Sequence, residues 1–179
     1  MEHIIETPRL FIRELLPTDV AGMFDLDSNP EVHQYLGKHP VQSREEVVGV
    51  LDFIRQQYKD NGIGRWAMVD KKTGDFIGWT GFKFVTDLTN NHVNYHDLGY
   101  RLRQKYWGMG IATEAAMACL DYGFNQLGFE EVFAMADCDN DGSNKILTKL
   151  GFTRIETFDL DGEPHHWYRL DQASFERIK

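Results

Sequence analysis

Hydrophobic and polar residues alternate in the segment RLFIRE, between Pro8 and Glu14, which predicts a short first β-strand. The following LLPTDV favours a helix, because proline suits the first helical turn. SNPEV repeats this signal, with Pro30 placed after two residues that can cap a helix. Ser43 and Glu46 have the spacing of a capping box, and the apolar residues after them recur on one helical face: Val47, Val50, Leu51 and Ile54. Two or three helices are therefore expected before the main sheet.

Patterns of period two dominate the middle of the chain. GRWAMVDKKTGDFIGWTGFKFV predicts a β-hairpin, with aromatic and other apolar residues in two strands around the turn KKTG. VNYHDLGYRLR predicts a further strand, in which Gly99 marks a bulge or a close backbone approach. A helical pattern then runs from about Met109 to Leu127 and is followed by the strand EVFAMAD.

The C-terminal third continues to alternate between helices and strands. A helix is expected from about Gly142 to Leu150, then the strand FTRIETFDL, which a DG turn leads back into HHWYRL. Asp171 caps a short terminal helix. A meander followed by strand-helix-strand-helix-strand predicts one α/β domain over residues 1–179, a mixed sheet with helices on both faces. Within it, residues 94–137 form a crossover unit whose two strands are parallel neighbours.

Composition narrows the class of protein. The hydrophobic content of 42% and charged content of 26%, over 179 residues, are those of an ordinary globular domain that needs no disulfides. No apolar run approaches the ~20 residues that span a bilayer, and the start MEHIIETPRLFIREL mixes in charges, so we expect a cytoplasmic protein. The net charge of -9 disfavours nucleic-acid binding and is compatible with an amine substrate. Cys119 and Cys138 are expected to be reduced thiols, and His92 and His96 are not expected to form a metal site.

The stretch RQKYWGMGIATEA, which begins at Arg103, joins the end of a strand to the start of a helix through two glycines. The first amide groups of a helix lack partners within it, and together with the helix dipole they form an anion site that suits phosphate. Gly108 and Gly110 let a ligand approach the backbone, although a tight turn is the simpler alternative for two glycines. A P-loop is excluded because no GK[ST] follows, and the Rossmann fingerprint lacks its third glycine. A phosphate held only by backbone fits an acyl carrier.

The longer stretch LGYRLRQKYWGMGIATEA resembles the acyl-CoA-binding motif of the GNAT acetyltransferases. That motif, Gln or Arg, two residues, Gly, one residue, and Gly or Ala, falls here on Lys105, Gly108 and Gly110, with Lys replacing the usual Arg or Gln. ETPRLFIREL, NPEVHQYLG, WAMVDKKTGDFIGWTGF and NDGSNKILTKLGFTRIE resemble the RimJ/RimL branch, in family order over most of the chain. The resemblance implies a twisted, mostly antiparallel sheet of six to seven strands with helices on both faces, and a parallel strand pair around the acyl-CoA site.

The resemblance also implies where acetyl-CoA binds. Leu102 and Arg103 would pair their backbone with the pantetheine arm, and an amide near Leu102 would polarise the thioester carbonyl. The glycine turn would wrap the pyrophosphate, and packing beside the turn is the alternative for Trp107. The expected acetyl-CoA-binding residues are Leu102, Arg103, Lys105, Trp107, Gly108, Met109, Gly110, Ile111, Ala112, Thr113, Asn140 and Ser143.

Asn140 and Ser143 match the Asn-x-x-Ser pattern of the family. The resemblance implies that the Asn side chain contacts pantetheine, and that the Ser hydroxyl lies near the thiol sulfur and protonates the departing thiolate. Helix capping is the alternative for both residues. Many relatives carry a tyrosine acid four residues before the Gly of LGF, but Leu147 stands there and cannot donate a proton. The role of acid therefore falls to Ser143 or to water.

Asp97 is the candidate general base, because several relatives place at this position a carboxylate that acts through water. Glu114 is expected to complement the helix dipole, and His96 to be packed or solvated. At pH 7 about 10% of an α-amino group is neutral but less than about 0.1% of a lysine amine, so a site without a strong base favours a weakly basic amine.

The resulting prediction is an enzyme that moves an acetyl group from acetyl-CoA to a primary amine, by direct attack in a ternary complex. The amine is either a protein N-terminus or a small molecule. A non-catalytic module of the same fold that binds acyl-CoA is the alternative. No metal, nucleic-acid or membrane partner is expected, and a homodimer is left open.

Overall fold

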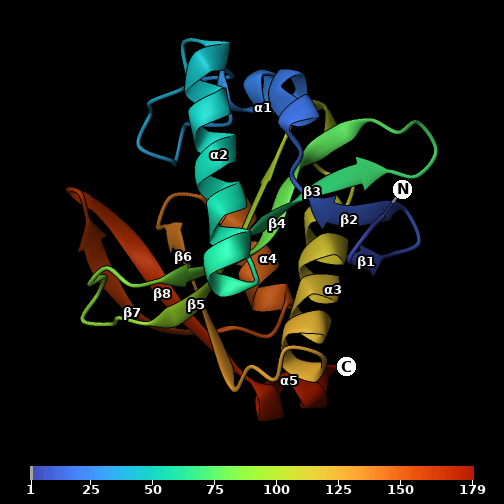
Figure 1. Cartoon of the computed structure of the whole chain (residues 1–179). Coiled ribbons are helices and arrows are strands. Elements are labelled where there is room, and N and C mark those ends of the chain that lie inside the picture. The colour runs from blue at the N-terminus through green and yellow to red at the C-terminus, as the bar shows by residue number, and fades with distance from the viewer. Residues whose placement is uncertain (1) are drawn as a thin grey trace.

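Eight strands form one sheet in the order β1-β2-β3-β4-β5-β6-β8-β7 in the computed structural model, which describes residues 2–179 (Figure 1). The strands are β1 (Ile5–Glu6), β2 (Leu10–Glu14), β3 (Arg65–Asp70), β4 (Phe76–Val85), β5 (Tyr95–Leu102), β6 (Glu131–Asp137), β7 (Thr153–Leu160) and β8 (Glu163–Asp171). All neighbours are antiparallel except β5 and β6, which confirms the predicted mixed sheet with one parallel pair. The count exceeds the predicted six to seven because β1 has only 2 residues, too few for an alternating pattern to show.

The helices differ from the predicted ones mainly before β3. They are α1 (Val20–Asp27), α2 (Arg44–Asn61), α3 (Ile111–Asn125), α4 (Asp141–Lys149) and α5 (Gln172–Ile178), with 3-10 helices at Pro17–Asp19 and Gln104–Tyr106. The hydroxyl of Ser43 caps α2 by accepting from the N–H of Glu46 at 3.3 Å. The predicted helix at SNPEV is wrong, because residues 30–38 form successive turns. That stretch is short, and Gly37 and Lys38 end it with φ of +84° and +56°, so a helical nucleus there has little to propagate into.

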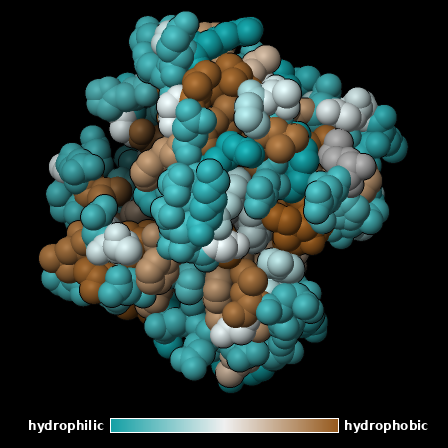
Figure 2. Space-filling model, viewed as in Figure 1, coloured by the Kyte–Doolittle hydropathy of each residue, from teal (hydrophilic) through white to brown (hydrophobic). Residues whose placement is uncertain are grey.

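Helices cover both faces of the sheet, as predicted (Figure 1). On one face α1 and α2 pack against β3, in a cluster that includes Leu26, Leu51 and Ala67. On the other face α3, α4 and α5 share a larger core, in which Leu120 of α3 and Leu98 of β5 are buried. Hydrophobic residues on the viewed surface form several separate patches (Figure 2). Within residues 2–179, no helix combines the length and the apolar character that a membrane crossing requires.

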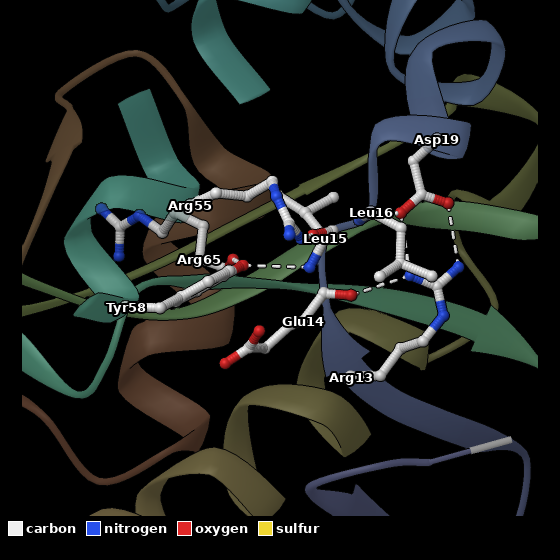
Figure 3. Close-up of polar contacts among 8 residues, drawn as sticks. All are labelled: Arg13, Glu14, Leu15, Leu16, Asp19, Arg55, Tyr58 and Arg65. Carbon is white, nitrogen blue, oxygen red and sulfur yellow. Dashed lines mark hydrogen bonds and ion pairs between the residues drawn. The ribbon is translucent and has the colours of Figure 1, made fainter. Parts of the chain in front are cut away.

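Tyr58 of α2 ties that helix to the start of β3. Its hydroxyl donates to the carbonyl of Arg65 and accepts from the N–H of Leu15 at 3.0 Å (Figure 3). Close by, Arg13 donates two hydrogen bonds to Asp19, at 2.8 and 2.9 Å (Figure 3). The bond from Tyr58 fixes the backbone of Arg65, whose side chain reaches across the sheet to Asp97 of β5.

Gly99 of β5 makes room for that side chain. The pairing of β5 with β4 runs through Gly99 without a register shift, so the strand has no bulge there. A Cβ at this position would lie 2.8 Å from the guanidinium carbon of Arg65. Of the two predicted alternatives, the bulge is therefore wrong and a close approach is found. The group that approaches the backbone of Gly99 is the Arg65 side chain and not another backbone segment.

Candidate active site

Strands β5 and β6 share one registered pair, at Asp97, although both strands continue beyond it. On the other side of β5, the N–H of Arg103 donates to the carbonyl of Ile77 at 2.9 Å. Antiparallel partners alternate between bonded and non-bonded pairs, so the backbone groups of Tyr100 and Leu102 point away from β4, toward β6. The separation of β5 from β6 therefore leaves a gap that is edged by unpaired backbone of β5.

The two residues predicted to pair with pantetheine offer different groups to this gap. The carbonyl of Leu102 accepts from the indole N–H of Trp107 at 2.9 Å, and the N–H of Leu102 faces the gap. Arg103 has its N–H bonded to β4 and its carbonyl bonded to the N–H of Tyr106 at 2.9 Å, and its guanidinium binds Asp25. The geometry supports the expected role of Leu102 and does not support a backbone role for Arg103.

The glycine turn before α3 depends on a backbone conformation that other residues disfavour. Gly108 and Gly110 have φ of +72° and +75°, in the left-handed region. In the described part of the chain, no atom beyond the adjoining residues lies within 4 Å of a Cβ built on Gly108, and the nearest to one built on Gly110 is 3.7 Å away. The left-handed Gly110 is also why α3 begins at Ile111 and not at the predicted Met109. Among residues 2–179, no side chain caps this end of α3, so its first amides are free to bind an anion.

Arg9 and Glu114 fasten the N-terminal segment to the glycine turn. The guanidinium of Arg9 donates to the carbonyl of Met109 at 2.8 Å and to the Glu114 carboxylate at 2.6 Å. That carboxylate also accepts from the hydroxyl of Thr7 at 2.6 Å. Burial alone would raise the pKa of Glu114, but the hydrogen bonds from Thr7 and Arg9 outweigh it, and the pKa lies below its ordinary value. Glu114 is thus an anchor of the turn as well as an acidic residue near the start of a helix.

Asn140 and Ser143 lie at the start of α4, where they make different contacts. The side-chain oxygen of Asn140 accepts from the N–H of Ser143 at 3.2 Å, so Asn140 is the N-cap, and its contact with pantetheine stays a prediction. The hydroxyl of Ser143 lies 3.0 Å from that of Tyr100, whose one proton is also within hydrogen-bonding distance of the Ser143 carbonyl, at 3.2 Å. Leu147 is buried in the core. Sequence reasoning missed Tyr100, because within its strand it is one more large residue in an alternating pattern.

An open cavity of about 780 Å³ lies beside α4, and its lining includes Thr113 of α3 and Tyr168 of β8. Three basic residues line it, against one carboxylate, Asp141; they are Lys145, Lys149 and Arg154. Because Thr113 is in the first turn of α3, the cavity adjoins the free amides of that helix. A basic cavity in this place suits a phosphorylated ligand, although the whole chain carries a net charge of -9.

Asp97 lies on the other face of β5 from Tyr100, because side chains alternate along a strand. Asp97 is 6% exposed, and one of its oxygens accepts from the Arg65 guanidinium at 2.6 Å. Among the described residues, its second oxygen has no hydrogen-bond partner. Burial raises the pKa of Asp97, and the nearby charge of Arg65 opposes the rise. A carboxylate with a raised pKa and an unpaired oxygen can accept a proton, so Asp97 remains the candidate base.

The face of β5 that carries Asp97 is balanced in charge. Trp79 lies between two guanidiniums, with those of Arg65 and Arg101 at 5.1 and 5.0 Å from its ring centroid. Arg101 in turn donates to the buried carboxylate of Asp27 at 2.7 Å. Each of these two buried carboxylates is therefore paired with an arginine, and neither adds an unbalanced negative charge.

The remaining predicted residues take less specific positions. The ammonium group of Lys105 lies 3.5 Å from the carboxylate of Asp75, and Trp107 and Met109 are each about half exposed. Cys119 and Cys138 are free thiols, as predicted. Within residues 2–179, no group of three or more His, Cys, Asp or Glu residues is arranged to hold a metal ion.

Comparison with known proteins identifies this arrangement. The model of the acetyltransferase (GNAT) domain matches residues 9–153. An uncharacterized N-acetyltransferase of Bacillus subtilis, YoaA, is 30% identical over 86% of this chain and 85% of its own. Spermidine N(1)-acetyltransferase of Escherichia coli K12 is 27% identical over 89% of this chain and 78% of its own.

Solved structures agree in fold. A GNAT-family acetyltransferase from Bordetella pertussis superposes with a TM-score of 0.81 at 19% identity, over 94% of this chain and 99% of its own. The ribosomal-protein-S5-alanine acetyltransferase from Vibrio fischeri gives a TM-score of 0.75 at 20% identity, over 93% and 94%.

The chain belongs to the GNAT acetyltransferase family. It is accordingly an N-acetyltransferase, with acetyl-CoA as the acetyl donor and an amine as the acceptor. The left-handed glycines, the free amides of α3 and the basic cavity fit the phosphorylated half of such a donor.

Proposed function

We propose that the acetyl group passes directly from acetyl-CoA to a primary amine, with both bound at the gap between β5 and β6. One observation carries this proposal. The unpaired backbone of β5 faces that gap, with Ser143 against one face of the strand and Asp97 on the other. A thioester bound in the gap then has its sulfur on the Ser143 side of the strand. An amine can attack its carbonyl carbon from the Asp97 side.

The donor is held by the segment from Leu102 to Thr113 together with the start of α4. The free amides of α3 bind the pyrophosphate beside the left-handed glycines. The cavity lined by Lys145, Lys149 and Arg154 accepts further phosphate charge. Leu102 contributes its N–H, and Asn140 and Ser143 face the pantetheine end.

The chemistry then needs three groups of this chain. The acceptor nitrogen bonds to the acetyl carbon, and the N–H of Leu102 stabilises the negative charge that develops on the carbonyl oxygen. Asp97, directly or through water, takes the proton that the amine gives up. The carbon–sulfur bond breaks, and the hydroxyl of Ser143 donates its proton to the departing thiolate and regains one from solvent.

The acceptor that fits best has a single, weakly basic amino group. Asp27 and Asp97 are each paired with an arginine, so the face that the acceptor would contact offers little attraction to a polycation. An α-amino group also loses its proton more easily than a lysine amine, by about 2.5 pKa units. These arguments favour an amino acid derivative or a peptide N-terminus over a polyamine, although one relative is named as a spermidine acetyltransferase.

The test is release of free CoA thiol from acetyl-CoA, measured with a panel of N-terminal dipeptides, amino acids, amino sugars and polyamines. We expect turnover with one class of monoamine and little with spermidine. Turnover confined to polyamines would contradict the proposed acceptor but not the transferase. Binding of CoA without thiol release by any amine would instead favour a module that binds acyl-CoA. A cytoplasmic location stays a prediction, to be checked by fractionation, and the oligomeric state, which the sequence left open, can be measured by light scattering.

A further inference from the structure

Tyr100 of β5 reaches across the gap to α4. Its hydroxyl lies 3.0 Å from the hydroxyl oxygen of Ser143 and 3.2 Å from the carbonyl oxygen of the same residue, and its one proton can be given to either of them. No residue other than Ser143 bonds to this hydroxyl within the described part of the chain. The contact joins the strand that offers the Leu102 amide to the helix that offers the proposed acid.

The phenol of Tyr100 stays protonated under working conditions. Burial raises the pKa of Tyr100, and the hydrogen bond with Ser143 opposes only part of that rise. Because its proton is engaged by Ser143, this hydroxyl acts as a hydrogen-bond donor to that residue. It can donate a steady hydrogen bond, and the Ser143 oxygen is within its reach.

We propose that Tyr100 is a positioning residue for the transfer, and that it holds the Ser143 hydroxyl so that its proton is directed at the departing sulfur. This inference rests on the proposed function, because it assumes that sulfur lies beside Ser143. When the Tyr100 hydroxyl donates to the Ser143 oxygen, the serine proton is left to point elsewhere, into the gap. The same hydrogen bond stabilises the negative charge that builds on the serine oxygen while its proton moves to sulfur. Tyr100 keeps its own proton, and solvent restores that of Ser143.

The competing explanation is that Tyr100 only anchors α4. Both explanations predict lower stability when the hydroxyl is removed, so stability cannot separate them. They differ in whether the effect of Tyr100 on catalysis requires the Ser143 hydroxyl. Thr80 supplies a matched control, because it is paired with Tyr100 across β4 and β5 and its buried hydroxyl donates to the Gly99 carbonyl at 3.2 Å.

The first experiment measures steady-state thiol release by Tyr100→Phe, Ser143→Ala and the double variant. We expect Tyr100→Phe to lower kcat about tenfold, or about 1.4 kcal/mol in activation free energy, with little change in the KM for acetyl-CoA. In the Ser143→Ala background, Tyr100→Phe should cause no further loss of kcat. Thr80→Val should lower the unfolding temperature and leave kcat within about twofold of wild type. Equal losses of kcat from Tyr100→Phe with and without the Ser143 hydroxyl would overturn the inference.

The second experiment needs no turnover. The full chain is titrated with CoA and with desulfo-CoA, above the ordinary thiol pKa of about 8.5, by calorimetry. Wild type and Thr80→Val should bind CoA several-fold more tightly than desulfo-CoA, because the Ser143 hydroxyl donates to the thiolate. Tyr100→Phe should lose most of this preference, as Ser143→Ala does.

The two experiments separate the inference from the function on which it rests. A wild type without any preference for CoA over desulfo-CoA would show that Ser143 does not touch sulfur and would overturn the inference. A full preference retained by Tyr100→Phe would overturn it too. If no amine supports thiol release but Tyr100→Phe still loses the preference, the proposed function fails and the positioning by Tyr100 stands.

Discussion

Replacing Gly110 with Ala tests whether the bare turn before α3 binds acetyl-CoA. Gly110 has φ of +75°, and a Cβ there would meet no atom closer than 3.7 Å. The substitution therefore causes backbone strain and no clash. For an L-residue the left-handed conformation costs roughly 1–2 kcal/mol relative to the right-handed one.

This strain is divided between folding and binding. If the turn of the variant keeps its shape, the whole 1–2 kcal/mol appears as lost stability. If the turn relaxes in the free protein, the cost is met when the phosphates bind, and the affinity for CoA falls by up to about 5- to 30-fold. A Cβ that faces the phosphates would weaken CoA binding in either case.

Gly62 is the matched control. It ends α2 with φ of +71°, and no atom lies within 4 Å of a Cβ built on it. In urea titrations, Gly62→Ala should therefore lower the free energy of unfolding by about the same 1–2 kcal/mol. In calorimetry, it should leave the affinity for CoA unchanged. A Gly110→Ala variant that loses no stability and still binds CoA as tightly as Gly62→Ala and wild type would refute the assignment of the glycine turn as the phosphate site.

Three further predictions follow from single groups. Glu114→Gln should lower the thermal unfolding temperature near pH 7. The difference from wild type should shrink as the pH falls through the folded pKa of Glu114, because that pKa lies below the ordinary value of 4.5 and the carboxylate stabilises the fold only while ionised. A difference in unfolding temperature that does not depend on pH would refute the anchor with Arg9. Asp97→Asn should lower kcat/KM about 100-fold and remove the rising limb of the pH profile of kcat/KM. In wild type this limb should lie above the titration range of an ordinary Asp, because the pKa of Asp97 is raised. An unchanged pH profile in the variant would exclude Asp97 as the base. A thiol reagent should label Cys138 in the native protein, and CoA should protect Cys138 from labelling, because this residue lines the cavity. Cys119 should stay unlabelled, because burial raises the pKa of its thiol to about 12. Fast labelling of both thiols would contradict the buried placement of Cys119.

Local patterns were sufficient for most of the elements. The alternation in RLFIRE predicts β2, and the capping signal at Ser43 predicts the start of α2. Both elements depend mainly on the residues of their own segment. The same reasoning failed at SNPEV, where capping residues and a proline were present but the left-handed Gly37 and Lys38 end the stretch within a few residues. It also failed for β1, whose 2 residues form a strand only because β2 lies beside them.

The candidate site divides in the same way. Gly108, Gly110 and the helix after them lie within one stretch, so their chemistry could be argued from residues in sequence. Tyr100 and Ser143 are 43 residues apart, and Arg9 and Glu114 are 105 apart. No local pattern connects partners at such separations, and each residue taken alone has an ordinary explanation as core, cap or surface charge.

The sequence by itself determined the kind of protein, the order of its elements and the backbone shape that suits a phosphate. The order of the elements and the backbone shape follow from periodicity and from residues such as glycine, whose conformational range is a local property, whereas the kind of protein followed from the resemblance to the GNAT family. The tertiary structure decided which groups meet at the gap between β5 and β6, and that Arg103 uses its backbone within the sheet. It also decided that Asp97 is paired with Arg65 and retains one free oxygen. These outcomes depend on strand register and on burial, which arise only when distant segments pack together.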